Sequence, residues 1–196
     1  MLTATLAAPT TALADRSDTT FDVGIGVAVG AFGISGDFAT DNRAEGGFVL
    51  RVPFHVRVYN WEGEANIAFR GGASDGSFDT YSASGMSFRF KRFVQLGYTE
   101  SRRGNTWLHF EGYLRTSVDR MEFNRVSNDP VFGYGYGAGL QARLMGGRRS
   151  SKAGVSYSAF VDLGRVHLSS TGDEPGGGSA TMQSITFGIT MLGIGG

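Results

Sequence analysis

The chain has 196 residues, of which 31 are Gly, 4 are Pro and none is Cys. Without Cys, a disulfide framework and a zinc site built on thiolates are excluded. The 18 basic and 18 acidic side chains balance, so the net charge does not attract nucleic acid and we expect no nucleic-acid partner. No apolar run approaches the roughly 18 residues of a membrane-spanning helix, which argues against a helical membrane protein.

The first residues differ in composition from the rest. Residues 1–14 (MLTATLAAPTTALA) are small and largely apolar, and Ala12-Leu13-Ala14 fits the small-x-small pattern of a signal-peptide cleavage site before Asp15. The positive residues that usually open a secretory signal are not found in this stretch. We therefore expect residues 1–14 to be a signal-peptide remnant or a disordered N-terminus, and residues 15–196 to form one domain.

From Phe21 onward, apolar side chains alternate with polar residues or glycines. Successive side chains of a strand point to opposite faces, so each alternating segment has one apolar face and one polar or glycine-rich face. The segments predicted as strands are 21–31, 48–59, 64–70, 86–98, 107–115, 132–144, 155–163 and 184–191. The chain is therefore expected to be all-β, without an amphipathic helix.

The predicted connections alternate between long and short. The long ones are 35–47, 71–85, 117–130 and 167–179, and the short ones are 60–63, 99–105 and 146–152. Short turns at one end and long polar loops at the other are the layout of bacterial outer-membrane barrels. Most of the predicted strands have 9–13 residues, which matches the roughly 9–11 tilted residues that cross a bilayer. The pattern predicts an eight-stranded antiparallel up-and-down transmembrane β-barrel in the bacterial outer membrane, with periplasmic termini.

The direction of the apolar face distinguishes this barrel from a soluble, lipocalin-like ligand-binding barrel. A soluble barrel would expose Gly133, Gly135, Gly137 and Gly139 to water, where they cover nothing. The inverted arrangement puts glycines and charges into a lumen that eight strands make just wide enough for side chains to fill. Charges confined there must be paired. The predicted luminal charge network is Asp22, Arg51, Arg57, Glu64, Arg70, Arg89, Glu111, Arg115, Arg143 and Asp162.

Pairing across this lumen is expected to close it. Arg51, Arg115 and Arg143 share the inward face with Glu64 and Glu111. A network of these side chains blocks a wide channel because each charge occupies space and binds its partner. We therefore predict at most a narrow pore.

A family resemblance rests on Phe132–Leu144 (FGYGYGAGLQARL) and the final strand. They resemble the small eight-stranded outer-membrane barrels of the OmpA/OmpX-like and opacity-porin-like superfamily. Its closing strand carries a polar–x–Gly–x–x–aromatic–x–aromatic signal, in which Thr186, Gly188 and Met191 occupy the first three marked positions. Gly193 replaces the last aromatic. The resemblance implies the barrel-insertion machinery as a partner during biogenesis, and outer-membrane lipid or lipopolysaccharide as surroundings, but no activity.

No motif predicts catalysis, a cofactor or a metal. The glycines of 24–30 imitate a phosphate-binding loop, but they lie inside a strand with no helix after them. His55 and His109 are far apart in sequence and are expected to form luminal hydrogen bonds rather than bind a metal. We therefore predict a protein that is not an enzyme, with no catalytic residues, no metal and no cofactor.

His167 and Ser169 support one alternative, an outer-membrane lipid-modifying hydrolase. They resemble the His-x-Ser pair of a lipid A deacylase, in which His takes the Ser proton and a carboxylate orients His. Asp173 and Glu174 are nearby carboxylates, although Ser170 stands where that family has Asn. This hydrolase and the soluble lipocalin-like barrel are the two alternatives to the main prediction.

The main prediction is an integral outer-membrane barrel with a structural or interaction role. Four long extracellular loops would carry any contact with a protein or surface ligand, because loops on a rigid scaffold usually hold binding specificity. A subunit of a larger envelope complex would have the same sequence features.

Arg92 is the one charge that breaks the apolar face of the fourth strand. Strict alternation from Phe88 and Phe90 points it at lipid, where an Arg at the bilayer midplane costs about 2–4 kcal/mol. A β-bulge around Lys91 and Arg92 would turn it inward. A position near the rim would instead let the side chain reach the head groups. We predict that one of these arrangements operates.

Overall fold

The computed structural model describes residues 21–58, 61–74, 79–101, 104–123, 130–147, 153–170 and 178–195. The strands are β1 (Phe21–Ser35), β2 (Ala44–Val58), β3 (Trp61–Ser74), β4 (Asp79–Ser101), β5 (Gly104–Phe123), β6 (Val131–Gly147), β7 (Ala153–Ser170) and β8 (Gly178–Gly195). A short helix, α1 (Asp37–Asp41), follows β1. The predicted segment 1–14 lies outside the described residues.

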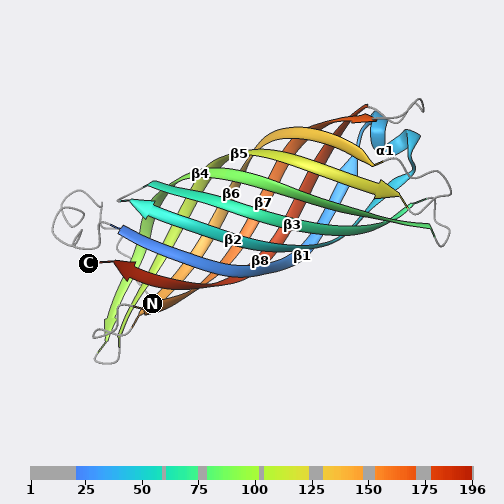
Figure 1. Cartoon of the computed structure of the whole chain (residues 1–196). Coiled ribbons are helices and arrows are strands. Elements are labelled where there is room, and N and C mark those ends of the chain that lie inside the picture. Colours follow the sequence, from blue (N-terminus) through green and yellow to red (C-terminus); the bar gives the residue numbers. More distant parts are fainter. Residues whose placement is uncertain are drawn as a thin grey trace, which may run out of the picture.

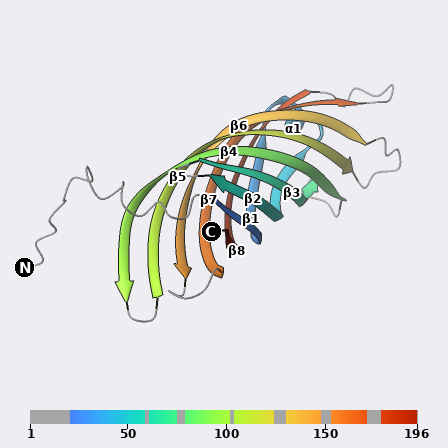
Figure 2. The same cartoon turned by 60° about the vertical axis from the view of Figure 1, so that its left-hand side comes forward.

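Consecutive strands pair antiparallel, and β1 also pairs with β8, so the sheet closes into a barrel (Figures 1 and 2). This confirms the predicted all-β, eight-stranded up-and-down fold. Phe21 pairs with Gly195, so β1 begins and β8 ends at the same end of the barrel, opposite α1 (Figure 1). Within the described residues, no helix has both the length and the apolar character needed to cross a membrane.

The register determines how far the strands tilt. Following paired residues once around the barrel from Phe21 leads back to Ala31 on the same strand, ten residues farther along. A stagger of this kind accompanies strands inclined by about 35–45° to the barrel axis. Residues far apart in sequence therefore face each other across a narrow lumen.

The strands extend farther than the alternation predicted. β4 has 23 residues and β5 has 20, and the connections at the α1 end shrink to 36–43, 75–78, 124–130 and 171–177. The predicted long loops are therefore wrong in extent. Backbone pairing continues past the point where the apolar contrast changes, because ladder hydrogen bonds do not depend on which face is apolar.

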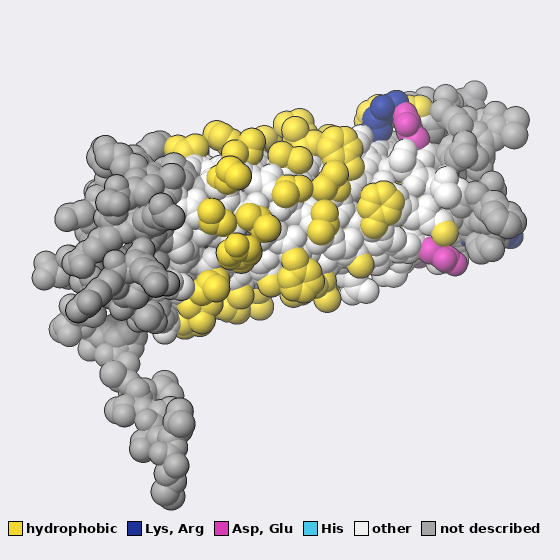
Figure 3. Space-filling view, turned by 90° about the horizontal axis from the view of Figure 1, so that it is seen from below, with side chains coloured by type: hydrophobic (Ala, Val, Ile, Leu, Met, Phe, Trp, Pro, Cys, Tyr) yellow, Lys and Arg dark blue, Asp and Glu magenta, His cyan; other side chains and the backbone are white. Residues whose placement is uncertain are grey.

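An apolar belt surrounds the barrel. On β5, Leu108, Phe110, Leu114 and Val118 point outward and are 41–69% exposed. Figure 3 shows the belt in yellow, with the charged side chains of that face gathered beyond one end of it. The inward face of the same strand segment is polar, as at Glu111.

Toward α1, the alternation continues with its polarity reversed. On β8, the apolar Ile185 points outward and the polar Ser184 points inward. The next two residues toward α1 show the opposite arrangement, because the polar Gln183 points outward and the apolar Met182 points inward. The outward side chains change from apolar to polar between Met86 and Ser84 on β4, Val118 and Arg120 on β5, and Leu163 and Arg165 on β7. We call the strand segments on the α1 side of these changes the collar.

The collar has the only large apolar interior among the described residues. Phe38 of α1 is fully buried there, and α1 lies against β1, β2 and β8. The other buried members are Phe32, Ala44, Val49, Tyr81, Ala83, Met121, Val131, Val166, Leu168, Ala180 and Met182. These apolar side chains occupy the interior of the barrel at the α1 end.

Arg92 points outward from a regular part of β4, opposite Trp61 and Gly112. Of the two arrangements expected for Arg92, the bulge at Lys91 and Arg92 does not occur, because the irregularity of β4 lies between Gln95 and Gly97. The Arg92 guanidinium lies 5.4 Å from the centre of the Trp61 ring. Gly112 lies midway along the outward apolar segment Leu108–Val118, and Val94 and Leu96 continue the exposed apolar face of β4 beyond Arg92. Arg92 therefore lies within the belt, and the rim arrangement is not observed; the neighbour of its guanidinium is the Trp61 ring.

Candidate functional site in the lumen

The interior of the belt is filled by charged and polar side chains. All ten residues of the predicted network are buried, with 0–7% of their surface exposed, and Glu62, Lys91 and Asp119 are buried with them. The buried bases are Arg51, Arg57, Arg70, Arg89, Lys91, Arg115 and Arg143, and the buried acids are Asp22, Glu62, Glu64, Glu111, Asp119 and Asp162. With neutral His, the described lumen carries one excess positive charge.

Strand alternation and register place opposite charges side by side on β3 and β4. Glu62 pairs in the ladder with Lys91, and Glu64 with Arg89. The Arg89 guanidinium donates to Glu64 at 2.7 Å, and the Lys91 ammonium contacts Glu64 and lies 3.0 Å from Glu62. Opposite charges directly across a strand pair stabilise a sheet.

Glu62 is the centre of the network toward the end opposite α1. Arg143, from β6, reaches across the lumen and donates two hydrogen bonds to Glu62, at 2.6 and 2.7 Å. Arg143 also lies 3.2 Å from Glu111, whose other oxygen lies 3.6 Å from Arg57. A bidentate Arg–carboxylate pair of this kind is among the strongest and most directional contacts that side chains form.

Asp162 is the corresponding centre closer to the collar. It accepts from Arg51 at 2.5 Å, from Arg89 at 3.2 Å and from the Tyr113 hydroxyl at 2.6 Å. Arg115 approaches to 4.0 Å. A Cβ at Gly164 would lie 2.6 Å from the Arg115 guanidinium, so a larger residue at this position would require that guanidinium to shift.

The ion pairs form one chain of alternating charge along the lumen. Its order is Arg51, Asp162, Arg89, Glu64, Lys91, Glu62, Arg143, Glu111, Arg57 and Asp22. Near the collar, Arg70 and Asp119 form a separate pair at 2.7 Å. At the opposite end the contacts are looser, with Asp22 lying 3.6 Å from Arg57 and 3.5 Å from His55.

The expected pairing differs in part from the arrangement in the structure. Arg143 does contact Glu111, but Glu64 binds Arg89 and Lys91 instead, and Arg51 contacts Asp162. Alternation indicates which face a side chain takes, whereas the partner across the lumen depends on how the barrel closes.

Glu62, Lys91 and Asp119 are missing from the sequence-based network. Glu62 falls within the predicted turn 60–63 and Asp119 within the predicted loop 117–130, although each continues the inward spacing of a neighbouring strand. Lys91 shares the alternation of Arg89 and could have been included on that ground. Glu62 and Asp119 therefore lie where the strands extend beyond their predicted ends, whereas Lys91 lies within a predicted strand.

The two luminal histidines do not assemble a metal site. His55 and His109 are 2% and 5% exposed, and His55 has Asp22 as its acidic neighbour at 3.5 Å. No group of three or more His, Asp or Glu side chains able to hold a metal occurs in the part of the chain that the structure describes.

His167 and Ser169 lie in the collar on the outward side of β7. The His167 ring lies against Tyr134 and Tyr136, with ring centres 5.3 and 6.1 Å away. The Ser169 hydroxyl donates to the carbonyl oxygen of Phe132 at 3.3 Å. Asp173 and Glu174 lie outside the described residues. The contacts of His167 and Ser169 are those of side chains on the barrel wall.

No known protein family and no curated protein matches this chain. Among solved structures, Neisserial surface protein A aligns over 87% of this chain and 96% of its own, with 11% identity and a TM-score of 0.52. At this identity the likeness shows the fold alone. A deletion mutant of the monoaromatic hydrocarbon channel TodX aligns over 90% of each chain with 6% identity, but its TM-score of 0.14 carries no weight.

Proposed function

We propose that the chain is an integral β-barrel protein of the bacterial outer membrane, with a closed lumen and a structural or interaction role. The observation that carries the proposal is the joint reversal of both faces where the belt meets the collar. In the belt the outside is apolar and the inside charged, whereas in the collar the inside is apolar.

The belt needs apolar surroundings. Its outward apolar segments, such as Leu108–Val118 and Val155–Leu163, have about the length of a membrane-crossing strand, roughly 9–11 residues. A continuous apolar band of this size is not stable against water. The soluble lipocalin-like alternative is not supported, because its ligand cavity would occupy the space that the ion pairs fill.

Aromatic side chains lie at both edges of the belt. Tyr134 and Tyr136 are 64% and 54% exposed beside the collar, and Trp61 is 45% exposed at the other edge. Tyr and Trp collect at membrane interfaces because one end of the ring system is apolar and the other polar. The collar would then project to the exterior, and both termini would lie in the periplasm after removal of residues 1–14.

The lumen is proposed to be closed to solutes. Arg51 and Arg89 contact Asp162, and Lys91 contacts Glu62, at 2.5–3.2 Å. All of these side chains are almost completely buried. A hydrated ion could pass only by separating buried ion pairs, which is costly in a low-dielectric interior. The network thus serves to hold the wall together, with at most a narrow path through it.

The collar, with its four short connections, is the proposed contact region for a protein or surface ligand. We propose no enzymatic activity, because the hydroxyl and imidazole of the His-x-Ser pair contact wall residues. Replacing His167 or Ser169 by Ala should leave lipid A unchanged. Loss of an acyl chain that requires both residues would favour the hydrolase.

Cell fractionation with a heat-modifiability gel tests the proposed location. The protein should appear in outer-membrane fractions, migrate as a compact species in SDS until boiled, and begin at Asp15. Protease added to intact cells should cut only within 36–43, 75–78, 124–130 or 171–177. Recovery in a soluble fraction, or cutting at Arg102 or Arg148, would contradict the proposal.

Planar-bilayer recording tests the closed lumen. The wild-type protein should show no sustained conductance, and the Glu62→Ala variant serves as a comparison in which the centre of the network is lost. A steady conductance of wild-type protein at the level of a water-filled porin would contradict the closed lumen without affecting the proposed location.

A further inference from the structure

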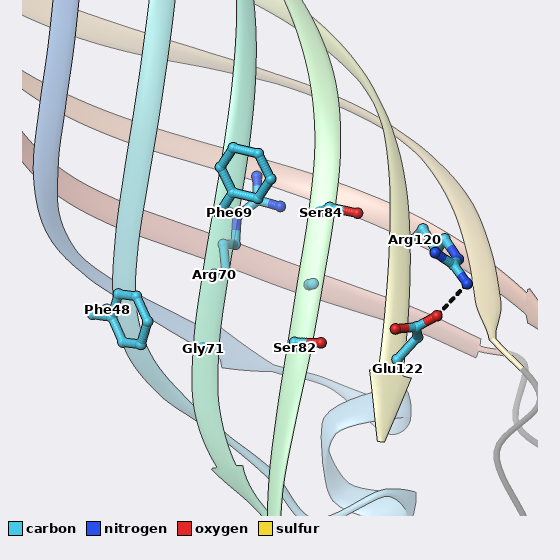
Figure 4. A pocket seen from close by; sticks show the side chains of 9 residues that line it. Phe48, Phe69, Arg70, Gly71, Ser82, Ser84, Arg120 and Glu122 are labelled. Atoms are coloured by element: carbon cyan, nitrogen blue, oxygen red, sulfur yellow. Dashed lines mark ion pairs between the residues drawn. The ribbon is translucent and has the colours of Figure 1, made fainter. Parts of the chain in front are cut away.

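A groove of about 290 Å³ opens on the outer wall at the border between belt and collar (Figure 4). Its outward lining consists of Phe48, Phe69, Ser82, Ser84, Arg120 and Glu122. In Figure 4 the two serines lie between the phenylalanines on one side and the ion pair of Arg120 with Glu122 on the other. The groove therefore has one aromatic wall, a polar floor and one charged wall.

The strand register explains why the wall is hollow here. Ser84 pairs with Phe69 on one side and Arg120 on the other, and Ser82 pairs with Gly71 and Glu122. Ser82, Ser84 and Gly71 thus leave space between the Phe48 and Phe69 rings on one side and Arg120 and Glu122 on the other. The serine hydroxyls are available on the floor as hydrogen-bonding groups for an oxygen-rich ligand.

The surface directly below the groove is apolar. Ile67, Met86 and Val118 form one row across β3, β4 and β5, and they are 45–63% exposed. A ligand that fills the groove therefore has an apolar track beneath its polar part, in the direction of the belt centre.

In the charged wall of the groove, the basic residue lies closer to the belt than the acidic residue. Arg120 is two residues closer to the belt than Glu122, and its guanidinium lies 5.9 Å from the centre of the Phe132 ring. The two side chains form an ion pair and are 48% and 44% exposed. An exposed pair of this kind contributes little to stability, so both charges are accessible to a ligand that offers each of them a partner.

We propose that the groove binds one phospholipid with a phosphoethanolamine head group. In such a lipid the phosphate lies next to the acyl chains and the ammonium lies beyond it. Arg120, nearer the belt, would bind the phosphate with its planar fork, and Glu122 would bind the ammonium. The acyl chains would extend over Ile67, Met86 and Val118.

This inference rests on the proposed membrane location and specifies the lipid at one site. A lipid with phosphate but no ammonium leaves Glu122 facing a second negative charge, so it fits less well. A choline head group offers Glu122 a cation without N–H donors, which weakens that contact. The order of preference at the groove is therefore ethanolamine above choline and glycerol head groups.

Native mass spectrometry of the full chain, refolded in detergent and checked by heat modifiability, tests the site. Phosphatidylethanolamine, phosphatidylglycerol and phosphatidylcholine with identical acyl chains are the probes. Wild-type protein should retain one phosphatidylethanolamine with at least about tenfold preference over phosphatidylglycerol, the factor that corresponds to about 1.4 kcal/mol.

Three variants distinguish the role of Arg120 from that of Glu122 in lipid binding. Arg120→Gln should lose retention of all three lipids, whereas Glu122→Gln should lose only the preference for ethanolamine. The double variant Arg120→Glu with Glu122→Arg keeps the net charge but reverses the order, so it should also lose the preference. Arg165→Gln, which alters an outward Arg elsewhere on the collar, is the matched control and should behave as wild type.

Equal retention of the three lipids by wild-type protein would overturn the inference, as would an unchanged preference in the charge-reversed variant. Either result in a protein that remains heat-modifiable and membrane-located would leave the proposed function intact. Recovery of the protein outside the membrane would contradict both the lipid site and the proposed function.

Discussion

The collar and the belt both have interiors filled by side chains, but these side chains are apolar in the collar and charged in the belt. Met121 and Met182 fill the collar interior beside Phe38, whereas Glu62 and Arg143 fill the belt interior. Both interiors are almost completely buried and belong to the same eight strands. The difference teaches that one barrel wall can enclose either an apolar or a charged interior when its outer face carries the opposite chemistry.

The two interiors also differ in how they respond to change. An apolar interior loses free energy in proportion to the volume removed. A buried charge network responds more sharply, because removal of one partner leaves the other charge without compensation. Substitutions in each region therefore test whether the contrast between collar and belt is real.

The largest effect is expected from Glu62→Ala in the belt. This change removes the bidentate partner of Arg143 and one of the two carboxylates that contact Lys91, at an expected cost of about 3–5 kcal/mol. Urea unfolding in lipid vesicles measures it. The matched control is Glu122→Ala, which breaks an exposed ion pair and should cost about 0–1 kcal/mol. Similar costs for the two variants would contradict the central place of Glu62.

Met121→Ala tests the apolar interior of the collar. Met121 is fully buried, and the cavity left behind should lower the free energy of unfolding by about 2–5 kcal/mol. Val118→Ala alters a neighbouring side chain that is 63% exposed on the outer wall, and it should cost less. If Val118→Ala were the more damaging change in the same unfolding assay, the faces of β5 would be assigned wrongly.

Arginine scanning of the outer wall locates the border between belt and collar. Leu114→Arg places a charge in the middle of the belt and should cost about 2–4 kcal/mol, whereas Gln183→Arg in the collar should cost about 0–1 kcal/mol. Refolding into vesicles followed by urea titration compares them. Equal costs would mean that no apolar phase surrounds the belt.

The smallest effect is expected where Arg92 meets Trp61. A double-mutant cycle with Arg92→Ala and Trp61→Ala should give a coupling free energy of about 0.5–2 kcal/mol, because the ring face attracts the guanidinium. Trp61→Phe retains a ring and should preserve part of the coupling. A coupling near zero would show that Arg92 obtains its stabilisation from another source.

The sequence was most informative where alternation was strict. Phe187 and Ile189 share one face of the final strand and Thr186 and Thr190 the other, and period two assigns such faces from local geometry alone. It was least informative at strand ends. Glu62 and Asp119 continue the inward face of a strand into residues that were predicted as connections, because polar residues that alternate with small ones resemble a loop.

The partners of the luminal charges required the closed barrel. Arg143 and Glu62 are separated by 81 residues in sequence, yet they form two hydrogen bonds. The bulge of β4 likewise lies between Gln95 and Gly97 rather than at Arg92, because the fit of β4 to β5 determines where an extra residue is accommodated.

Taken alone, the sequence determined the number of main strands, the apolar and polar face of each, and the charges that need a lumen. Those properties follow from the period of the side chains along one strand. Only the tertiary structure decided the ion-pair partners, the apolar interior under α1 and the groove beside Arg120. These features depend on register and closure, which bring together residues that no local pattern relates.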